Sequence, residues 1–547
     1  MLNHGSFLSL SRSQEKKRPL RGAANHAKRG AWGCVFLKRW AAVLLLICLT
    51  ACSALPPLEG RTVSQALVRA DGAHTRLGEG LSPWIEQHPG LSGVFPLPDA
   101  LDAFAARLLL IAAAQRTIDI QYYIWRDDIT GNLLLRALHE AARRQVRVRL
   151  LLDDNGTSGL DESLALLNAE PNIEVRLFNP FPQRRFKMLG FLTDFSRLNR
   201  RMHNKSLTVD GQATVVGGRN IGDEYFGATD GVAFADLDVL VAGEAVDDVS
   251  SDFDRYWNSA SAYPLETLVS LPPSASPTPL WQLESKNELD QNARLYMRAA
   301  TQSLFIENLL AGKLDMQWVP VRMVSDDPAK VLGQAPPEAL LLPRLMQLLA
   351  LPTKSVDLVS PYFVPMEQGV QAFGALVEQG VKVRILTNAM EATDVIAVHA
   401  GYSKYREPLL ERGVELYETR RQRSENAPKE KAGPFGSSGS SLHAKTFAVD
   451  GKRVFVGSFN FDPRSARFNT ELGFVIESPS MAQAVSNVFE SSVHDRAYEL
   501  QLDESGKIVW LEETASGMRR LTQEPSTSFW QRLWVRFLSL LPIEPLL

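Results

Sequence analysis

A histidine, a lysine and an aspartate near the C-terminal end of the chain are spaced so that they could act together. His443, Lys445 and Asp450 form an H-x-K-x4-D pattern, and Gly-Ser-Phe-Asn follows at 457–460. Apolar and polar residues alternate over 442–449, which predicts a strand, and Asp-Gly at 450–451 predicts a tight hairpin turn. Because residues two apart on a strand share a face, a base or nucleophile would lie beside a phosphate-binding cation.

The same pattern occurs a second time, at a constant offset of 240 residues. His203, Lys205 and Asp210 are followed by Gly-Gly-Arg-Asn at 217–220. One copy could be a surface hairpin with an incidental histidine, but two copies with the same Gly-x-x-Asn ending do not arise by chance. Strand–helix–strand patterns at 117–152 and again at 355–386 indicate that whole domains are repeated. We therefore predict an α/β protein of two similar halves whose motifs meet in one site.

The paired motifs resemble those of the phospholipase D superfamily, and the resemblance extends over about residues 95–500. The phrases at 118–125, 217–226 and 393–400 make the chain most similar to the bacterial C-type cardiolipin synthases. This resemblance implies two pseudo-symmetric αβα domains with the active site at their interface. It also implies a phosphatidyltransferase that forms cardiolipin from phosphatidylglycerol and a second phospholipid, for which phosphatidylethanolamine is one candidate.

A phosphodiester that is attacked at phosphorus needs its two free oxygens held and its leaving group protonated. Lys205 and Lys445 can bind the oxygens, and the amides of Asn220 and Asn460 and the hydroxyl of Ser458 can assist them. Gly218 stands where the second motif has Ser458, so the first half lacks one hydroxyl. Lysine is a poor metal ligand, which argues against a metal site, and we expect no cofactor.

In the superfamily mechanism one imidazole attacks phosphorus and the other acts as acid and base. The resemblance assigns the nucleophile to His203 and the acid–base role to His443. Asp236 and Glu471 stand at positions that resemble the carboxylates that orient the two rings. The motif aspartates, Asp210 and Asp450, count among the catalytic residues of the pattern, although their turn positions indicate a structural role.

The rest of the chain predicts how these residues reach a membrane. A basic stretch, an apolar run at 40–49 and Leu-x-Ala-Cys at 49–52 are typical of a signal peptide whose Cys52 becomes lipidated, while a retained anchor is the alternative. We therefore expect a bacterial membrane-associated lipoprotein that faces the periplasm. The predicted divisions are a leader at 1–51 (disordered over 1–33), an arm at 52–94, a first domain at 95–285, a second at 286–505 and a tail at 506–547.

Two segments mix arginine with large apolar residues. Residues 181–201 could bind an anionic membrane surface or pack on the domain as a solvated helix. Residues 528–541 have helical spacing and predict a membrane-surface helix, or a terminal helix docked on the protein. The Gly/Ser-rich stretch within 420–441 predicts a mobile loop beside the site. His399, in the phrase at 393–400, could line a headgroup pocket.

Composition helps to choose among functions. The net charge of −3 and a pI near 6.4 give no electrostatic reason to expect nucleic acid as a partner, and no protein partner is evident. Hydrolysis of phospholipids to phosphatidic acid needs the same residues, with water as acceptor. A nuclease and a non-catalytic lipid-binding membrane protein are weaker alternatives, the second because both motifs are intact.

Overall fold

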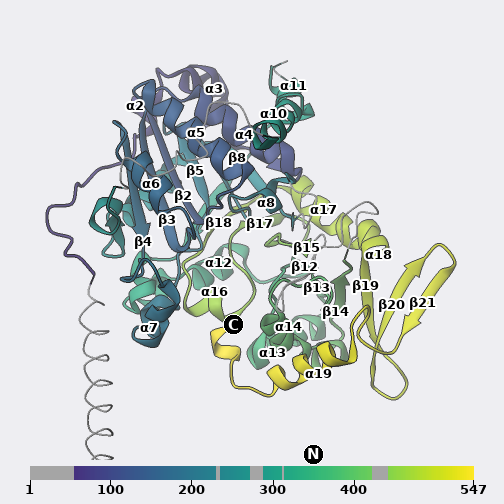
Figure 1. The fold of residues 1–547 in the computed structure, drawn as a ribbon. Coiled ribbons are helices and arrows are strands. Elements are labelled where there is room, and N and C mark those ends of the chain that lie inside the picture. The colour runs from purple at the N-terminus through teal and green to yellow at the C-terminus, as the bar shows by residue number, and fades with distance from the viewer. Residues whose placement is uncertain (1–54, 229–233, 272–287, 311–312, 422–440) are drawn as a thin grey trace, which may run out of the picture. The chain divides into compact units, whose positions relative to one another are not determined.

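The computed structural model describes residues 55–228, 234–271, 288–310, 313–421 and 441–547, and residues 55–547 form one compact unit (Figure 1). The predicted leader, Cys52 and most of the Gly/Ser-rich stretch lie outside the described residues. Within the described residues, no helix is both long and apolar enough to cross a bilayer.

Two large mixed sheets have equivalent strands in the same order, which confirms the predicted repeat of α/β halves. The nine-stranded sheet runs β10 (Gln317–Val319), β1 (Ser92–Leu97), β8 (Asp238–Gly243), β6 (Ala213–Gly217), β5 (Ser206–Val209), β2 (Thr117–Ile124), β3 (Arg147–Gly156), β4 (Ile173–Phe178), β9 (Ala262–Pro264). The ten-stranded sheet runs β11 (Val321–Ser325), β18 (Leu472–Ile476), β17 (Arg453–Gly457), β16 (Thr446–Val449), β12 (Ser355–Val359), β13 (Lys382–Asn388), β14 (Glu415–Thr419), β19 (Ala497–Leu502), β20 (Ile508–Thr514), β21 (Gly517–Leu521).

A buried ion pair marks the equivalent point in each half. Asp119 on β2 accepts from Arg149 on the parallel neighbour β3 at 2.6 Å, and Asp357 on β12 accepts from Arg384 on β13 at 2.6 Å. Each aspartate is directly opposite its arginine in the strand register. The halves therefore repeat their buried polar contacts as well as their strand order.

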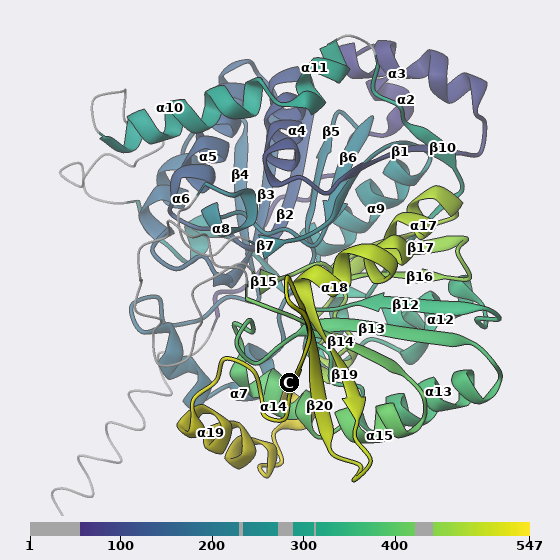
Figure 2. The same ribbon diagram turned by 90° about the vertical axis from the view of Figure 1, so that its right-hand side faces the viewer.

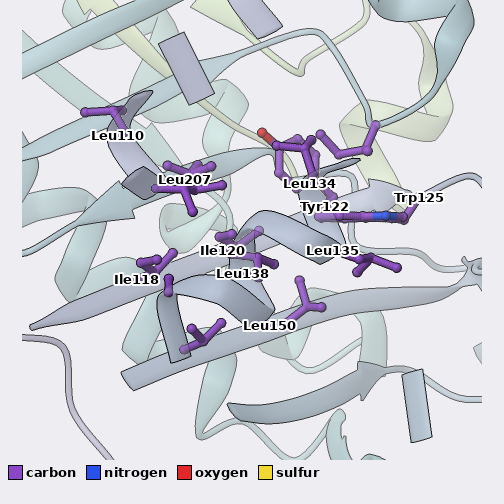
Figure 3. Close-up of a cluster of buried hydrophobic side chains, with 14 of the residues drawn as sticks. Leu110, Ile118, Ile120, Tyr122, Trp125, Leu134, Leu135, Leu138, Leu150 and Leu207 are labelled. Atoms are coloured by element: carbon purple, nitrogen blue, oxygen red, sulfur yellow. The ribbon is translucent and has the colours of Figure 1, made fainter. Parts of the chain in front are cut away.

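Helices cover both faces of the first sheet. On one face, α4 (Ala100–Ala113), α5 (Ile129–Arg143) and α6 (Asp161–Asn168) pack on side chains of β2 and β3, and Figure 3 shows part of this core, including Ile118, Leu134 and Leu150. On the other face, α9 (Ala245–Trp257) places Phe253, Tyr256 and Trp257 against Leu151 and Phe178. Alternate residues of these strands face opposite sides, so strands buried on both faces read as continuous apolar runs.

A second core is shared by the two halves. It joins Val216 and Val239 of the first sheet to Val454 and Phe474 of the second, with residues of α9 and α17 (Pro479–Asn487). A two-stranded parallel pairing of β7 (Phe234–Ala235) with β15 (Ser441–Leu442) also links them. In Figure 2 the two sheets lie one above the other, with β7 and β15 between them. The halves are thus held together by a continuous apolar core and by backbone pairing.

The chain crosses from one sheet to the other later than the predicted boundary at 285. Helices α10 (Glu288–Thr301) and α11 (Leu304–Leu310) pack on α4, and β10 pairs with β1 of the first sheet. The second sheet begins with β11 at Val321. At the other end, β20 and β21, which fall in the predicted tail, extend the second sheet. The composition of these segments gave no sign of the sheet to which each belongs.

The predicted arm lies along the first half. Arg61 donates to the carbonyls of Ser259 and Ala262 at 2.5 and 2.9 Å, and the backbone N–H of Ala66 donates to Asp254 at 2.8 Å. Helices α2 (Arg69–Gly72) and α3 (Arg76–Gln87) follow. Backbone and side-chain hydrogen bonds therefore fix the arm to α9 and to the residues after it.

The predicted strand over 442–449 is wrong in one respect. β15 ends at Leu442 and β16 begins at Thr446, so His443 and Lys445 lie between two strands. The backbone N–H groups of His443 and Ala444 both donate to the carbonyl of Ala235, at 2.8 and 3.1 Å, so this part of the chain leaves the second sheet to pair with the first half. Alternation alone cannot show which sheet a residue pairs with.

The two motif aspartates sit in hairpin turns, as predicted. Asp210 and Asp450 have positive φ values of 51° and 54°, and each is followed by a glycine of positive φ, as a type I′ turn requires. The Asp210 carboxylate accepts from the backbone N–H groups of Gln115, Arg116 and Thr117 at 2.7–2.9 Å. Asp450 accepts equivalently from residues 353–355. Each aspartate therefore anchors the start of the central strand of its half.

We expect Asp210→Ala to lower the free energy of unfolding by about 2–4 kcal/mol, because three backbone donors at the start of β2 lose a charged, fully buried acceptor. Urea denaturation followed by circular dichroism measures this. Asp450→Ala should cost less, since Asp450 is partly exposed and water can replace it. The exposed Glu86→Ala serves as control. Wild-type stability in Asp210→Ala would contradict this structural role.

Candidate active site

The histidine of the first motif is oriented by a carboxylate of the second half. His203 Nδ1 lies 2.8 Å from Glu471 Oε2, and Glu471 is adjacent to the start of β18. The backbone N–H of His203 donates to the carbonyl of Thr470 at 2.8 Å, which holds the motif beside that strand. The ring nitrogen Nε2 is thereby left as the atom available for chemistry.

The histidine of the second motif makes the reciprocal contact. His443 Nδ1 lies 2.5 Å from Asp236 Oδ2, and Asp236 follows β7 of the first half. Both carboxylates and both imidazole rings are buried. The two halves therefore exchange carboxylates, and each imidazole is held by the half that does not supply it.

The second residue of the Gly-Gly and Gly-Ser pairs contacts a different carboxylate in each motif: Gly218 lies against Asp236, and Ser458 lies against Glu471. A Cβ on Gly218 would lie 2.2 Å from Asp236 Oδ1, so no larger residue fits there. In the second motif the Ser458 hydroxyl donates to Glu471 Oε2 at 2.5 Å. Ser458 therefore binds the orienting carboxylate, whereas the sequence predicted that it would bind phosphate. The Ser465 hydroxyl holds the other oxygen, Oε1, at 2.8 Å.

Two buried lysines lie beside the rings. Lys205 Nζ donates to the carbonyl of His203 at 2.6 Å. Lys445 Nζ bonds the carbonyl of His443 and lies 3.0 and 3.1 Å from the two ring nitrogens of His443. Burial lowers the pKa of Lys205 well below its usual range and that of Lys445 to about 8. Burial disfavours the charged form of each lysine, and a bound anion would stabilise that form, so the two lysines favour an anionic ligand.

The side-chain amides of the two motif asparagines differ in their hydrogen bonds. Asn220 donates to the hydroxyl of Tyr225 at 3.0 Å and accepts from the backbone N–H of Ile124 at 3.2 Å. Asn460 is buried, and its Oδ1 has no hydrogen-bond partner among the described residues. Asn220 is thus held at both ends of its amide, whereas the Oδ1 of Asn460 is a buried acceptor without a partner among the described residues.

The electrostatics of the two imidazoles differ. Burial, the two lysines and His443 lower the pKa of His203 well below its usual range. Burial and Lys445 also lower the pKa of His443, but Asp236 opposes them. The Asp236 pKa is held far below its usual range, because His443 and Lys445 outweigh its burial, whereas burial raises the pKa of Glu471 to about 7. His203 is therefore neutral at rest, and His443 has the partner better able to stabilise a positive ring.

Sequence reasoning missed four residues near the rings. Tyr123 packs edge-on to His203 with ring centroids 5.0 Å apart, and Tyr225 packs edge-on to His443 at 5.2 Å. Tyr362 donates to Asp394 at 2.6 Å. Three of the four lie in the phrases that carried the family resemblance, and Tyr362 follows the carboxyl end of β12, where sites in parallel sheets often form.

Other predicted residues lie elsewhere. Asp210 and Asp450 bind the backbone, as described above. His399, on α14 (Ile396–Ser403), is buried, and its Nε2 lies 3.0 Å from Glu524 and 2.9 Å from Arg406, so it ties down the tail and does not line a headgroup site. In the segment 181–201, Arg184 and Lys187 pair with Asp154, and Arg201 pairs with Asp153. Only short helices, η1 (Lys187–Leu192) and α7 (Phe195–Leu198), form there, and Met188 and Leu192 are exposed, so the segment is not one continuous helix and the choice between the two predictions stays open.

The tail helix α19 (Phe529–Ser539) is docked on the protein, which is one of the two alternatives predicted for it. Val535 is buried against Met390 and Ala400, so the helix docks on α14. Its other face leaves large apolar side chains exposed: Phe529, Trp530, Leu533, Trp534, Phe537 and, just after the helix, Leu540. Figure 1 shows α19 beside α14, and α19 is therefore held on the protein with an apolar face outward.

Comparison with known proteins gives a consistent result. The family described as "Cardiolipin synthase, PLD-like domain" matches residues 108–257 and 345–493, one match in each half. The chain is 50% identical to cardiolipin synthase C of Escherichia coli over 472 residues, which cover 86% of this chain and all of that protein. It is 28% identical to a cardiolipin synthase of Geobacillus kaustophilus, over 75% of this chain and 68% of that protein.

We expect Asp236→Asn to lower the pKa of His443, because it removes the largest contribution that stabilises the protonated ring against burial and Lys445. Lys445→Met should raise it. NMR titration of histidine-labelled protein measures both shifts, and Asp102→Asn on α4 is the control. An unchanged His443 pKa in Asp236→Asn would contradict the pairing of His443 with the carboxylate of the other half.

Proposed function

The chain belongs to the cardiolipin synthase family of phospholipase D-like proteins and is a phosphatidyltransferase of that type, and we propose that it forms cardiolipin from phosphatidylglycerol and a second phospholipid. The proposed route passes through a phosphohistidine. The observation that carries it is the crossed arrangement, in which two imidazoles with oriented Nδ1 atoms stand beside two buried lysines.

In the first step, His203 Nε2 attacks phosphorus and the bond from phosphorus to the headgroup oxygen breaks. His443, in its protonated form, gives its Nε2 proton to that oxygen, so the headgroup leaves as a neutral alcohol. Glu471 accepts the Nδ1–H of His203 and supports the positive charge that develops on this ring. In the second step, His443 takes the proton of an incoming hydroxyl, whose oxygen displaces His203.

Neutralisation of the phosphate is the task of the two lysines. In the resting site they repel a proton on either ring, which keeps His203 nucleophilic. A bound phosphodiester adds one negative charge beside the lysines and weakens their repulsion of a proton, so the pKa of His443 rises on binding and Asp236 stabilises the protonated ring. The substrate thereby creates the general acid that its own cleavage requires. The side-chain N–H group of Asn460 is a donor that can support the same anion.

We expect wild-type protein in mixed micelles with labelled phosphatidylglycerol, with and without phosphatidylethanolamine, to yield labelled cardiolipin and a free headgroup. His203→Ala and His443→Ala should each lower the rate by about 10³-fold or more, since each removes a covalent or proton-transfer step. Acid-labile label should accumulate on wild-type protein but not on His203→Ala.

The same assay separates the alternatives. Phosphatidic acid without cardiolipin would replace transfer by hydrolysis, which needs the same residues. Normal turnover in both histidine variants would overturn the two-histidine mechanism. Asp102→Asn serves as a matched control outside the site.

The membrane side of the proposal rests on α19. Trp530 is 74% exposed and Leu540 is 79% exposed, and Arg532 and Arg536 are interspersed among the apolar residues. Trp and Arg beside an apolar face favour the headgroup zone of a bilayer. We propose that this face inserts shallowly and that a lipid on Cys52, which lies outside the described residues, provides the second anchor of a lipoprotein facing the periplasm. Two such signals are what stable anchoring generally needs.

We expect Trp530→Glu with Phe537→Glu to reduce binding to phosphatidylglycerol-containing vesicles by about 10-fold or more, because two apolar side chains are lost from the bilayer and two charges enter it. Co-sedimentation of a Cys52→Ser chain measures the effect of α19 alone. Met518→Glu, at a comparably exposed apolar position on β21, is the control. Equal vesicle binding by all three proteins would refute a membrane role for α19.

A further inference from the structure

A third carboxylate, which the mechanism above does not use, lies at the carboxyl end of the second sheet. Asp394 is half-buried in the turn before α14, and its Oδ2 accepts from the Tyr362 hydroxyl at 2.6 Å. One oxygen is thus fixed in place by Tyr362, and the side chain is partly exposed, so a ligand can reach it.

The backbone places Tyr362 beside the second motif. The next residue, Phe363, forms a parallel bridge with Phe461, and the N–H of Val364 donates to the carbonyl of Phe461 at 2.8 Å. The Ser360 hydroxyl, at the end of β12, donates to the carbonyl of Tyr362 at 2.7 Å. Tyr362 is therefore held next to Asn460 by contacts on both sides of it.

Two further tyrosines complete a cluster around the rings. Tyr123 packs against His203 and Tyr225 against His443. Burial and then Asp394 raise the pKa of Tyr362 well above its usual range, and Tyr225 and Tyr123 act in the same direction. Asp394 also opposes the lowering of the pKa of His443. Tyr362 and Tyr225 are therefore protonated, and the charge of this cluster comes from the carboxylate of Asp394.

That charge has no use in holding phosphate. Both rings already have their own carboxylates, and a further anion beside a phosphodiester is repulsive. A carboxylate becomes favourable there only if the ligand brings hydrogen-bond donors or a positive charge beyond its phosphate. Tyrosine faces also attract an ammonium group through their ring quadrupoles.

We propose that Asp394 and Tyr362, flanked by Tyr123 and Tyr225, form the subsite for the polar headgroup at the alcohol side of the transferred phosphate. The ligand it takes is a phospholipid headgroup with hydroxyl or ammonium donors, such as glycerol or ethanolamine. This inference rests on the proposed function and names the group that selects among its lipid substrates. Asp394 binds the headgroup and takes no part in proton transfer.

The test compares three lipids that share one phosphatidyl group: phosphatidylglycerol, phosphatidylethanolamine and phosphatidylmethanol, whose headgroup has no donor. Headgroup release is measured for wild type, Asp394→Ala, Asp394→Asn and Tyr362→Phe, with Asp102→Asn as control. We expect Asp394→Ala to lower kcat/KM for glycerol and ethanolamine headgroups by about tenfold relative to the methyl headgroup, as loss of a charge-assisted hydrogen bond requires.

The variants Asp394→Asn and Tyr362→Phe, which keep the shape of the side chain, show whether the subsite recognises an ammonium group or a hydroxyl group. An asparagine oxygen still accepts from a hydroxyl but carries no charge, so Asp394→Asn should lose more rate with the ethanolamine headgroup than with glycerol if an ammonium group is held. Equal losses on the two indicate recognition of hydroxyl-type donors. Tyr362→Phe, which frees Asp394 without removing its charge, should weaken the selectivity in the same direction by less.

Two outcomes overturn the inference, and they differ. If wild type is active and Asp394→Ala keeps the wild-type ratios among the three lipids, the subsite is refuted while phosphatidyl transfer stands. If wild type releases no headgroup from any of the lipids, the proposed function fails and the subsite fails with it. Folding of each variant is checked by thermal unfolding, and Asp394→Asn and Tyr362→Phe keep the test open if Asp394→Ala does not fold.

Discussion

The exchange of carboxylates between the two halves is the interaction on which the site depends. Glu471 reaches His203 across 268 residues of sequence, and Asp236 reaches His443 across 207. Neither ring would keep its tautomer and orientation in an isolated half, because its partner belongs to the other. The shared apolar core and the pairing of β7 with β15 hold the halves in register, so their packing is also what aligns the reacting nitrogens. Fold and chemistry here share one interface.

The burial of so many charges is explained by their balance. Lys205 and Lys445 face Asp236 and Glu471, so the four groups cancel before any ligand binds. The balance is imperfect, since burial raises the pKa of Glu471 to about 7 and lowers that of Lys445 to about 8. Groups whose pKa values lie this close to neutral pH change their protonation when a single anion is added beside them. A phosphodiester is such an anion, and its arrival adds one negative charge to these four groups and favours the protonated form of each.

The sequence predicted the repeat and the turns, because motif spacing and the order of strands are local patterns, and the family resemblance indicated Asp236 and Glu471 as the orienting acids. It could not predict which acid meets which ring, since that pairing depends on how two halves dock. It also misplaced His443 and Lys445 within a strand, because the alternation over 442–449 continues unchanged through the point where the chain leaves one sheet for the other. The sequence also gave no sign that Arg184 and Lys187 pair with Asp154 of β3, which lies 30 and 33 residues earlier. Long-range partners decided each of these cases.

The two halves are alike in sequence motif but not in electrostatics, and this difference supports the division of labour between the rings. Gly218 leaves room for the short side chain of Asp236 to approach His443 directly, whereas Ser458 and Ser465 hold the longer Glu471 by its two oxygens. Asp236 stays ionised and so favours a proton on His443, while the raised pKa of Glu471 gives His203 a weaker counter-charge. A ring that must begin neutral and a ring that must begin protonated need such unequal partners. A perfectly symmetric pair would leave both rings in the same state, with no proton to give to the leaving group.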